Sequence, residues 1–206
     1  MFRALLACVA LTCCVPAAAA DRTILVFGDS LSAAYGLAAD QGWVHLLGTR
    51  AGRAGLDWRI VNASVSGETT AGGLRRLPAD LKRHQPAIVV IALGANDALR
   101  GQPITGIRDN LEKMVRLARN ARAEPVLVGL MIPPNYGIDY AAQFQALYSA
   151  LAARQRLALV PFLLEGIADK PEFFQADQLH PSAAAQPIIL DTVWKTLEPL
   201  LRKRAS

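Results

Sequence analysis

Four short polar clusters carry the residue types that nucleophilic catalysis needs, and they are spread along a chain of 206 residues. In chain order they are 28–30 (Gly-Asp-Ser), 64–68 (Ser-Val-Ser-Gly-Glu), 94–97 (Gly-Ala-Asn-Asp) and 177–180 (Asp-Gln-Leu-His). A serine hydroxyl is a weak nucleophile until a neighbouring base takes its proton, and a histidine oriented by a carboxylate is a common base. The clusters supply candidates for all three parts.

Ser30 follows an apolar run, residues 23–27, that ends on Gly28. Three interpretations are open. Ser30 can cap a helix, because its oxygen accepts an unpaired backbone N–H. It can belong to an anion site at a helix N-terminus, although both glycine-rich nucleotide motifs are absent from the turn. It can also be an activated nucleophile, although the chain has no G-x-S-x-G elbow.

His180 favours the third interpretation, because it lies three residues after Asp177 in a loop closed by Pro181. A carboxylate held against one imidazole nitrogen fixes the tautomer and leaves the other nitrogen to accept a serine proton. The alternative is that Asp177 only caps the terminal helix and His180 is incidental. The other two histidines, His45 and His84, fit an ordinary helix position and a solvated helix end.

Gly67 and Asn96 are candidates for the electrophilic part of the site. The backbone N–H groups of Ser30 and Gly67, with the Asn96 amide, could hold an oxyanion; removing one such donor costs about 2.7–4 kcal/mol. The alternatives are turn geometry with positive φ for Gly67 and an Asx-turn for Asn96. We assign Asp29 and Asp97 to support of the turns and the backbone.

The elements that must position these clusters are strand-like runs alternating with longer amphipathic stretches. Expected strands are 23–27, 57–62, 87–93, 125–130 and 157–160; expected helices are 42–53, 70–84, 104–123, 140–156 and 182–202. This alternation predicts right-handed βαβ units and a parallel sheet with helices on both faces. Ligands of such sheets bind at the carboxyl ends of the strands, where the clusters should converge.

The first twenty residues predict a secretory signal peptide rather than part of the fold. Arg3 precedes an apolar stretch, 4–15, and the small residues 18–20 fit cleavage near Ala20–Asp21. A retained anchor and lipidation at Cys14 are weaker alternatives. All three cysteines lie in this segment, so the remaining chain, 21–206, has no thiol for a disulfide, a nucleophile or a metal ligand.

The formal charge of +5 is modest and no basic block is interleaved with aromatic residues. This composition argues against a nucleic-acid partner, and it is compatible with transient contact with membrane lipids. We find no internal repeat or second-domain boundary, and we expect residues 21–206 to form a single domain and a monomer.

The ordered blocks resemble the SGNH, or GDSL, hydrolase family. They are Gly28-Asp29-Ser30-Leu31, Gly67, Gly94-x-Asn96-Asp97 and Asp177-x-x-His180. The stretches GDSLSAAYGL, VNASVSGETTAGGLRRLPADL, LGANDALRG and DQLHP, with the turn at 134–137, are similar to the bacterial periplasmic thioesterase/lysophospholipase/arylesterase branch. One departure is Ala95, where close relatives often carry glycine.

The resemblance implies a three-layer α/β/α flavodoxin-like fold with a five-stranded parallel sheet. It also implies a Ser30-Asp177-His180 triad, an oxyanion hole from Ser30, Gly67 and Asn96, and neither cofactor nor metal. Residues 98–103 correspond to a mobile substrate-binding loop. The full set of substrate-binding candidates is Ala98, Leu99, Arg100, Gly101, Met131, Ile132, Pro133 and Tyr136.

The sequence therefore predicts a periplasmic or secreted serine hydrolase that cleaves small acyl esters and thioesters. The leading alternative within hydrolases is a carbohydrate O-deacetylase. Outside hydrolases, a lipid-binding module or a flavodoxin-like phosphate binder would leave the late Asp-x-x-His pair unexplained.

Overall fold

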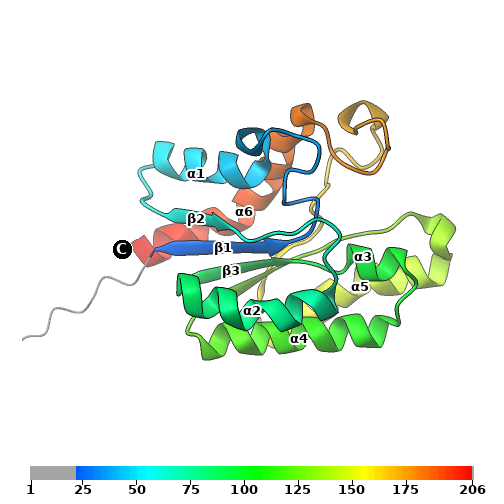
Figure 1. Ribbon diagram of the computed structural model, residues 1–206, viewed down its shortest axis with the longest axis horizontal. Helices are drawn as coiled ribbons and strands as arrows, with labels where there is room; N and C mark the ends of the chain where they lie inside the picture. The colour runs from blue at the N-terminus through cyan, green and yellow to red at the C-terminus, as the bar shows by residue number, and fades with distance from the viewer. Residues whose placement is uncertain (1–21, 206) are drawn as a thin grey trace, which may run out of the picture.

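The computed structural model describes residues 22–205, so the predicted signal peptide lies outside the described residues (Figure 1). Five parallel strands form one sheet in the order β2-β1-β3-β4-β5. Their bounds are β1 Thr23–Gly28, β2 Arg59–Asn62, β3 Ile88–Ala92, β4 Glu124–Val128 and β5 Ala158–Val160. In sheets of this order the topological switch point lies between β1 and β3, and the first and third polar clusters follow these two strands.

Helices cover both faces of the sheet, which confirms the predicted three-layer α/β/α fold (Figure 1). One face carries α1 (Trp43–Arg53) and α6 (Gln186–Ala205), and the other carries α2 (Thr70–His84), α4 (Ile104–Asn120) and α5 (Ile138–Gln155). A short helix, α3 (Ala95–Leu99), follows β3. No helix within residues 22–205 combines the length and apolarity that crossing a bilayer requires.

The core lies between the sheet and these helices. Every residue of β1 and of β3 is buried, as expected for central parallel strands that are packed on both faces. The Thr23 hydroxyl is the polar exception in β1, and it accepts a hydrogen bond of 3.1 Å from Arg59 Nε. Long apolar side chains thus fix the two strands whose carboxyl ends carry Ser30 and Asn96.

Close approaches require glycine at the end of β1, Gly28, and at the residue before α3, Gly94. A Cβ at Gly28 would lie 2.8 Å from Ser32 Oγ and 3.1 Å from the carbonyl oxygen of Ala92. Gly94 has a φ of +126°, and a Cβ there would lie 2.5 Å from the Tyr148 hydroxyl. A side chain at either position would push apart the strand ends that carry the site.

Two expected segments differ from the structure. The terminal helix α6 begins at Gln186, after the 3-10 turn Ala183–Ala185, rather than at residue 182. The segment 98–103, expected to be a loop, begins inside α3, whose N-terminal cap is Gly94. The remaining expected elements are present, with ends that differ by up to three residues.

Candidate active site

The structure brings Ser30, His180 and Asp177 into a chain of hydrogen bonds, although Ser30 and His180 are 150 residues apart in sequence. His180 Nε2 lies 3.0 Å from Ser30 Oγ. His180 Nδ1 lies 2.7 Å from Asp177 Oδ2. Because an ionised carboxylate can only accept, Nδ1 carries the hydrogen in this arrangement and Nε2 is free to accept the serine proton.

The Asp177–His180 segment builds its own geometry locally. Asp177 Oδ1 accepts hydrogen bonds from the backbone N–H groups of Leu179, at 2.9 Å, and His180, at 3.0 Å. The N–H and the ring of His180, with the N–H of Leu179, stabilise the ionised form and lower the pKa of the Asp177 carboxyl to about 2. The carboxylate is therefore charged over the whole physiological pH range.

Tyr35 and Gln175 connect this segment to the nucleophile turn. The ring of Tyr35 lies against that of His180, with centroids 4.3 Å apart and an interplanar angle of 35°. Gln175 Nε2 donates to the carbonyl oxygens of Tyr35, at 2.8 Å, and Pro181, at 3.1 Å. Neither residue was predicted. Tyr35 lies within the stretch GDSLSAAYGL, in an irregular segment, and Gln175 lies two residues before Asp177.

Asp29, the residue before the candidate nucleophile, is buried, and both of its carboxylate oxygens accept hydrogen bonds. Its Oδ1 accepts from the Leu31 N–H at 3.0 Å, and its Oδ2 accepts from Asn96 Nδ2 at 3.2 Å. Burial raises the pKa of Asp29 to about 6, although the Leu31 N–H, His180 and Asn96 each act in the opposite direction. Asp29 thereby orients the Asn96 amide toward the site.

Asp97 is buried and anchors the start of α2. Its two oxygens accept from the Thr70 N–H at 2.8 Å and from the Thr70 hydroxyl at 2.6 Å. Asn110 Nδ2 on α4 donates to the same hydroxyl at 3.1 Å. This buried network fixes the end of β3, and hence Asn96, relative to the helix that follows the Gly67 loop.

A cavity of about 260 Å³ opens at the triad. Ser30, Gly67, Asn96 and His180 all border it, so the three candidate oxyanion donors share one space with the nucleophile and base. Gly67 has a φ of +77°, in the left-handed region that favours glycine. Within residues 22–205, no group of three or more acidic, histidine or cysteine side chains is arranged to hold a metal.

The predicted substrate-binding residues divide into two groups. Leu99, Met131, Ile132 and Pro133 border the cavity. Ala98 does not, because it is fully buried in α3. Arg100, Gly101 and Tyr136 are exposed and also lie outside the cavity lining.

Seven further residues border the cavity, among them Asp29, Leu31 and Ala95. Tyr35, Ser66, Leu164 and Leu179 border the cavity and were not predicted. Ser66 directly precedes Gly67, and Leu179 lies within the Asp177-x-x-His180 motif. Leu164 lies in the irregular segment after β5, where the sequence carries no periodic signal.

The chain is similar to known proteins over most of its length. The chain matches the model of the GDSL-like lipase/acylhydrolase family over residues 26–187. Esterase TesA of Pseudomonas aeruginosa is 52% identical over 183 residues, which cover 89% of this chain and 91% of that protein. Thioesterase 1/protease 1/lysophospholipase L1 of Escherichia coli K12 is 42% identical over 189 residues, 90% of this chain and 87% of that protein.

A solved structure of psychrotrophic esterase EstA from Pseudoalteromonas sp., inhibited by monoethylphosphonate, superimposes with a TM-score of 0.84. It is 41% identical in sequence, and the match covers 88% of this chain and 100% of that chain. The likeness therefore extends over the whole sheet and the segments that carry the candidate site.

Proposed function

This chain belongs to the GDSL-like lipase/acylhydrolase family, and from that premise we propose that it is a serine hydrolase cleaving carboxylic esters and thioesters of acyl chains. The observation that carries the proposal is the 3.0 Å contact between Ser30 Oγ and His180 Nε2 at the mouth of the cavity. Relatives named esterase and thioesterase support the reaction class.

In the first half of the reaction, His180 Nε2 accepts the Ser30 hydroxyl proton while Oγ attacks the acyl carbonyl carbon. Asp177 remains ionised and stabilises the imidazolium that forms. The carbonyl oxygen becomes an oxyanion, which the N–H groups of Ser30 and Gly67 and the Asn96 amide stabilise. His180 then protonates the leaving alcohol or thiol, and an acyl-enzyme on Ser30 remains.

In the second half, His180 removes a proton from water, which attacks the acyl-enzyme carbonyl. The same three donors stabilise the second oxyanion, and collapse of the intermediate returns the proton to Ser30. All the chemistry is assigned to side chains and backbone groups of this chain, so the proposal includes no cofactor.

The substrate we propose is a small acyl ester or thioester whose chain lies along the apolar wall. Leu99, Met131, Ile132 and Leu164 give the cavity a mainly apolar lining, and apolar pockets with a few placed polar groups suit such ligands. We also propose that the protein is exported after signal-peptide cleavage. In that compartment lysophospholipids or exogenous esters are more available than cytosolic acyl-CoA.

The test compares wild type with Ser30→Ala on p-nitrophenyl esters from acetyl to palmitoyl and on an acyl thioester. We expect Ser30→Ala to lower kcat by at least about 10⁴-fold, because loss of a triad nucleophile removes covalent catalysis. Ser32→Ala is the matched control, since the Ser32 hydroxyl is buried without a hydrogen-bond partner among the described residues. Its kcat should stay within a few-fold of wild type.

Two results would contradict the proposal. Turnover that survives in Ser30→Ala would exclude Ser30 as the nucleophile. No turnover of any ester or thioester by folded wild type would exclude the hydrolase and favour a lipid-binding module. A strong preference for acetyl over longer chains would instead favour the O-deacetylase alternative.

A further inference from the structure

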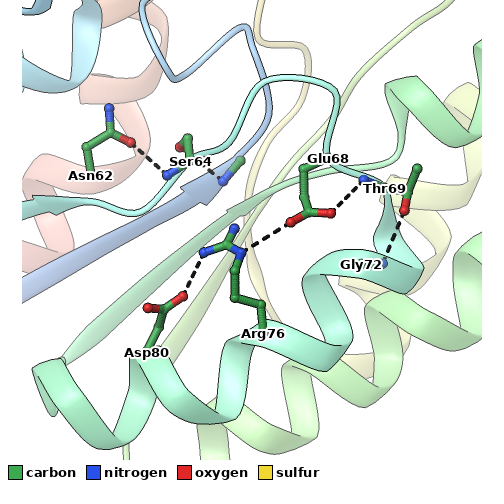
Figure 2. Close-up of polar contacts among 8 residues, drawn as sticks. Asn62, Ser64, Glu68, Thr69, Gly72, Arg76 and Asp80 are labelled. Atoms are coloured by element: carbon green, nitrogen blue, oxygen red, sulfur yellow. Dashed lines mark hydrogen bonds and ion pairs between the residues drawn. The ribbon is translucent and has the colours of Figure 1, made fainter.

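The loop between β2 and α2, residues 63–69, carries Gly67 and is tied at its start to the nucleophile strand. Ser64 Oγ accepts the N–H of Gly28 at 3.1 Å, and Asn62 Oδ1 accepts the N–H of Ser64 at 3.1 Å (Figure 2). Asn62 Nδ2 also donates to the carbonyl oxygen of Ser32 at 2.8 Å. These bonds fix the first residues of the loop against the segment that presents Ser30.

The end of the same loop is held by Glu68, the residue after Gly67. Glu68 Oε2 accepts from Arg76 Nε at 3.2 Å, and its Oε1 accepts from the Thr69 N–H at 3.1 Å. Arg76 Nη1 in turn donates to Asp80 Oδ2 at 2.7 Å (Figure 2). The carboxylate occupies the space over Gly72 that a side chain there would need.

Arg76 connects this end of the loop to β1. Its guanidinium lies over the ring of Phe27, 4.2 Å from the ring centroid, and Phe27 is fully buried three residues before Ser30. The Arg76 and Glu68 side chains are only 29% and 14% exposed. Partial burial strengthens the attraction between them relative to a surface pair.

Gly67 lies in the turn 65–68, which the Glu68 N–H closes by donating to the carbonyl oxygen of Val65 at 3.1 Å. Among the described residues, no atom outside its chain neighbours lies within 4 Å of the position that a Cβ of Gly67 would take, so no side chain packs against this side of the glycine. Its carbonyl oxygen accepts one bond, of 3.3 Å, from the exposed side chain of Arg100. The direction of the Gly67 N–H therefore depends on the anchors on either side of it.

We propose that the Glu68–Arg76 ion pair is a positioning pair that holds the Gly67 N–H in its oxyanion-binding orientation. This inference rests on the proposed function. Neither residue borders the cavity, so the pair acts through Gly67 and not on the substrate. Oxyanion donors are effective because they are in place before charge develops, and a displacement of about 1 Å can cost 10²-fold in rate.

The test removes one carboxylate at a time from the same guanidinium. Glu68→Gln removes the partner in the loop, and Asp80→Asn, the matched control, removes the partner that lies within α2. We expect Glu68→Gln to lower kcat on p-nitrophenyl butyrate about 10- to 30-fold with KM within twofold. Asp80→Asn should leave kcat within about twofold, while both variants lose similar stability in urea.

A second measurement separates positioning from a general loss of structure. An alkylboronic acid forms a tetrahedral adduct on a serine nucleophile and so probes the oxyanion site directly. Its affinity should fall in Glu68→Gln by about the same factor as kcat/KM, and stay unchanged in Asp80→Asn. If Glu68→Gln folds poorly, Arg76→Lys replaces it as the test. This variant keeps the positive charge but cannot contact Glu68 and Asp80 with separate guanidinium nitrogens. We expect it to lower both kcat and the affinity for the boronic acid by about 3- to 10-fold.

The outcomes distinguish this proposal from the one on which it rests. Wild-type turnover with an unchanged kcat in Glu68→Gln would overturn the positioning pair alone. Equal losses in Glu68→Gln and Asp80→Asn would overturn it as well, because the pair would then be merely structural. Absence of turnover by wild type would overturn the proposed function and the positioning pair together.

Discussion

The two halves of the candidate site are held in different ways. Ser30, Gly67 and Asn96 follow β1, β2 and β3, and buried bonds between distant segments fix them, such as Asp29 to Asn96 and Asp97 to Thr70. Asp177 and His180 lie in one exposed segment after β5 and bond mainly to each other. The Asp177 side chain is 43% exposed, whereas Asp29 is 1% exposed.

The positions of the residues in the two halves are therefore fixed by different kinds of contact. Three donors from three segments can bind the same oxyanion only if the segments are fixed relative to one another. Long-range buried hydrogen bonds fix them. The Asp177–His180 pair takes its internal geometry from a turn of four residues, and Tyr35 and Gln175 hold that turn against the segment that carries Ser30. The first half therefore depends on the fold for its internal geometry, whereas the second half depends on the fold only for its contact with Ser30.

The largest effect that we expect is on kcat, and it differs between His180 and Asp177. His180→Ala should lower kcat by about 10⁵-fold, because the base is lost. Asp177→Asn should cost less, about 10²- to 10⁴-fold, because the carboxylate only orients and stabilises the imidazole. Steady-state kinetics on a short p-nitrophenyl ester measures both. An equal or larger loss for Asp177→Asn would contradict the assigned roles.

A smaller effect, on stability, tests whether the first half depends on the fold. Asp97→Ala should lower the free energy of unfolding by about 3–6 kcal/mol, since hydrogen bonds to a charged group contribute about 1.5–3 kcal/mol each and two are lost. Urea unfolding followed by circular dichroism measures the change. Asp109→Ala, which removes an exposed ion pair with Arg108 on α4, is the control and should cost less than about 1 kcal/mol.

The comparison would weaken if Asp177→Ala destabilised the protein as much as Asp97→Ala. In that case the exposed half would also be part of the folding unit, and the distinction drawn between long-range and local anchoring would be wrong.

The smallest effect concerns the pH dependence of stability in the buried half. Burial raises the pKa of Asp29 from 3.8 to about 6, so the folded protein binds a proton more tightly than the unfolded chain. Its contribution to stability is complete below pH 3.8 and is lost as pH rises through 6. Between pH 4 and 7, wild type should lose about 2–3 kcal/mol relative to Asp29→Asn.

Urea unfolding of both proteins across this pH range measures that difference. A stability difference that is constant from pH 4 to 7 would show that Asp29 titrates alike in the folded and unfolded chains. A difference that grows in favour of wild type as pH rises would show that its bonds to Leu31 and Asn96 outweigh its burial.

Much of this architecture could be predicted because its signals are local. The strand and helix pattern follows from short-range periodicity, and α2 occupies the predicted residues 70–84. Ser30 and the Asp177–His180 pair were found because each lies in a compact motif. Leu99 and Met131, predicted as substrate-binding residues, border the cavity.

The contacts that could not be predicted join segments far apart in sequence. The ring of Tyr35 contacts that of His180, and Asp29 accepts a hydrogen bond from Asn96, which is 67 residues away in sequence. No sequence pattern around these residues indicates which partner each one contacts. Ala98 was misassigned because a five-residue helix, α3, turns it into the core. Contacts between side chains that are distant in sequence depend on the packing of the whole fold, and a single sequence does not indicate them.

The separation of 150 residues between Ser30 and His180 has a consequence for the chain during its synthesis. In the proposed mechanism the nucleophile emerges from the ribosome 150 residues before its base, so a growing chain that lacks His180 should have no esterase activity. Domains generally fold as units once their sequence is available. Because His180 must lie against Ser30 for the proposed reaction, recovery of esterase activity after dilution from denaturant should report when the segment after β5 has docked against the end of β1.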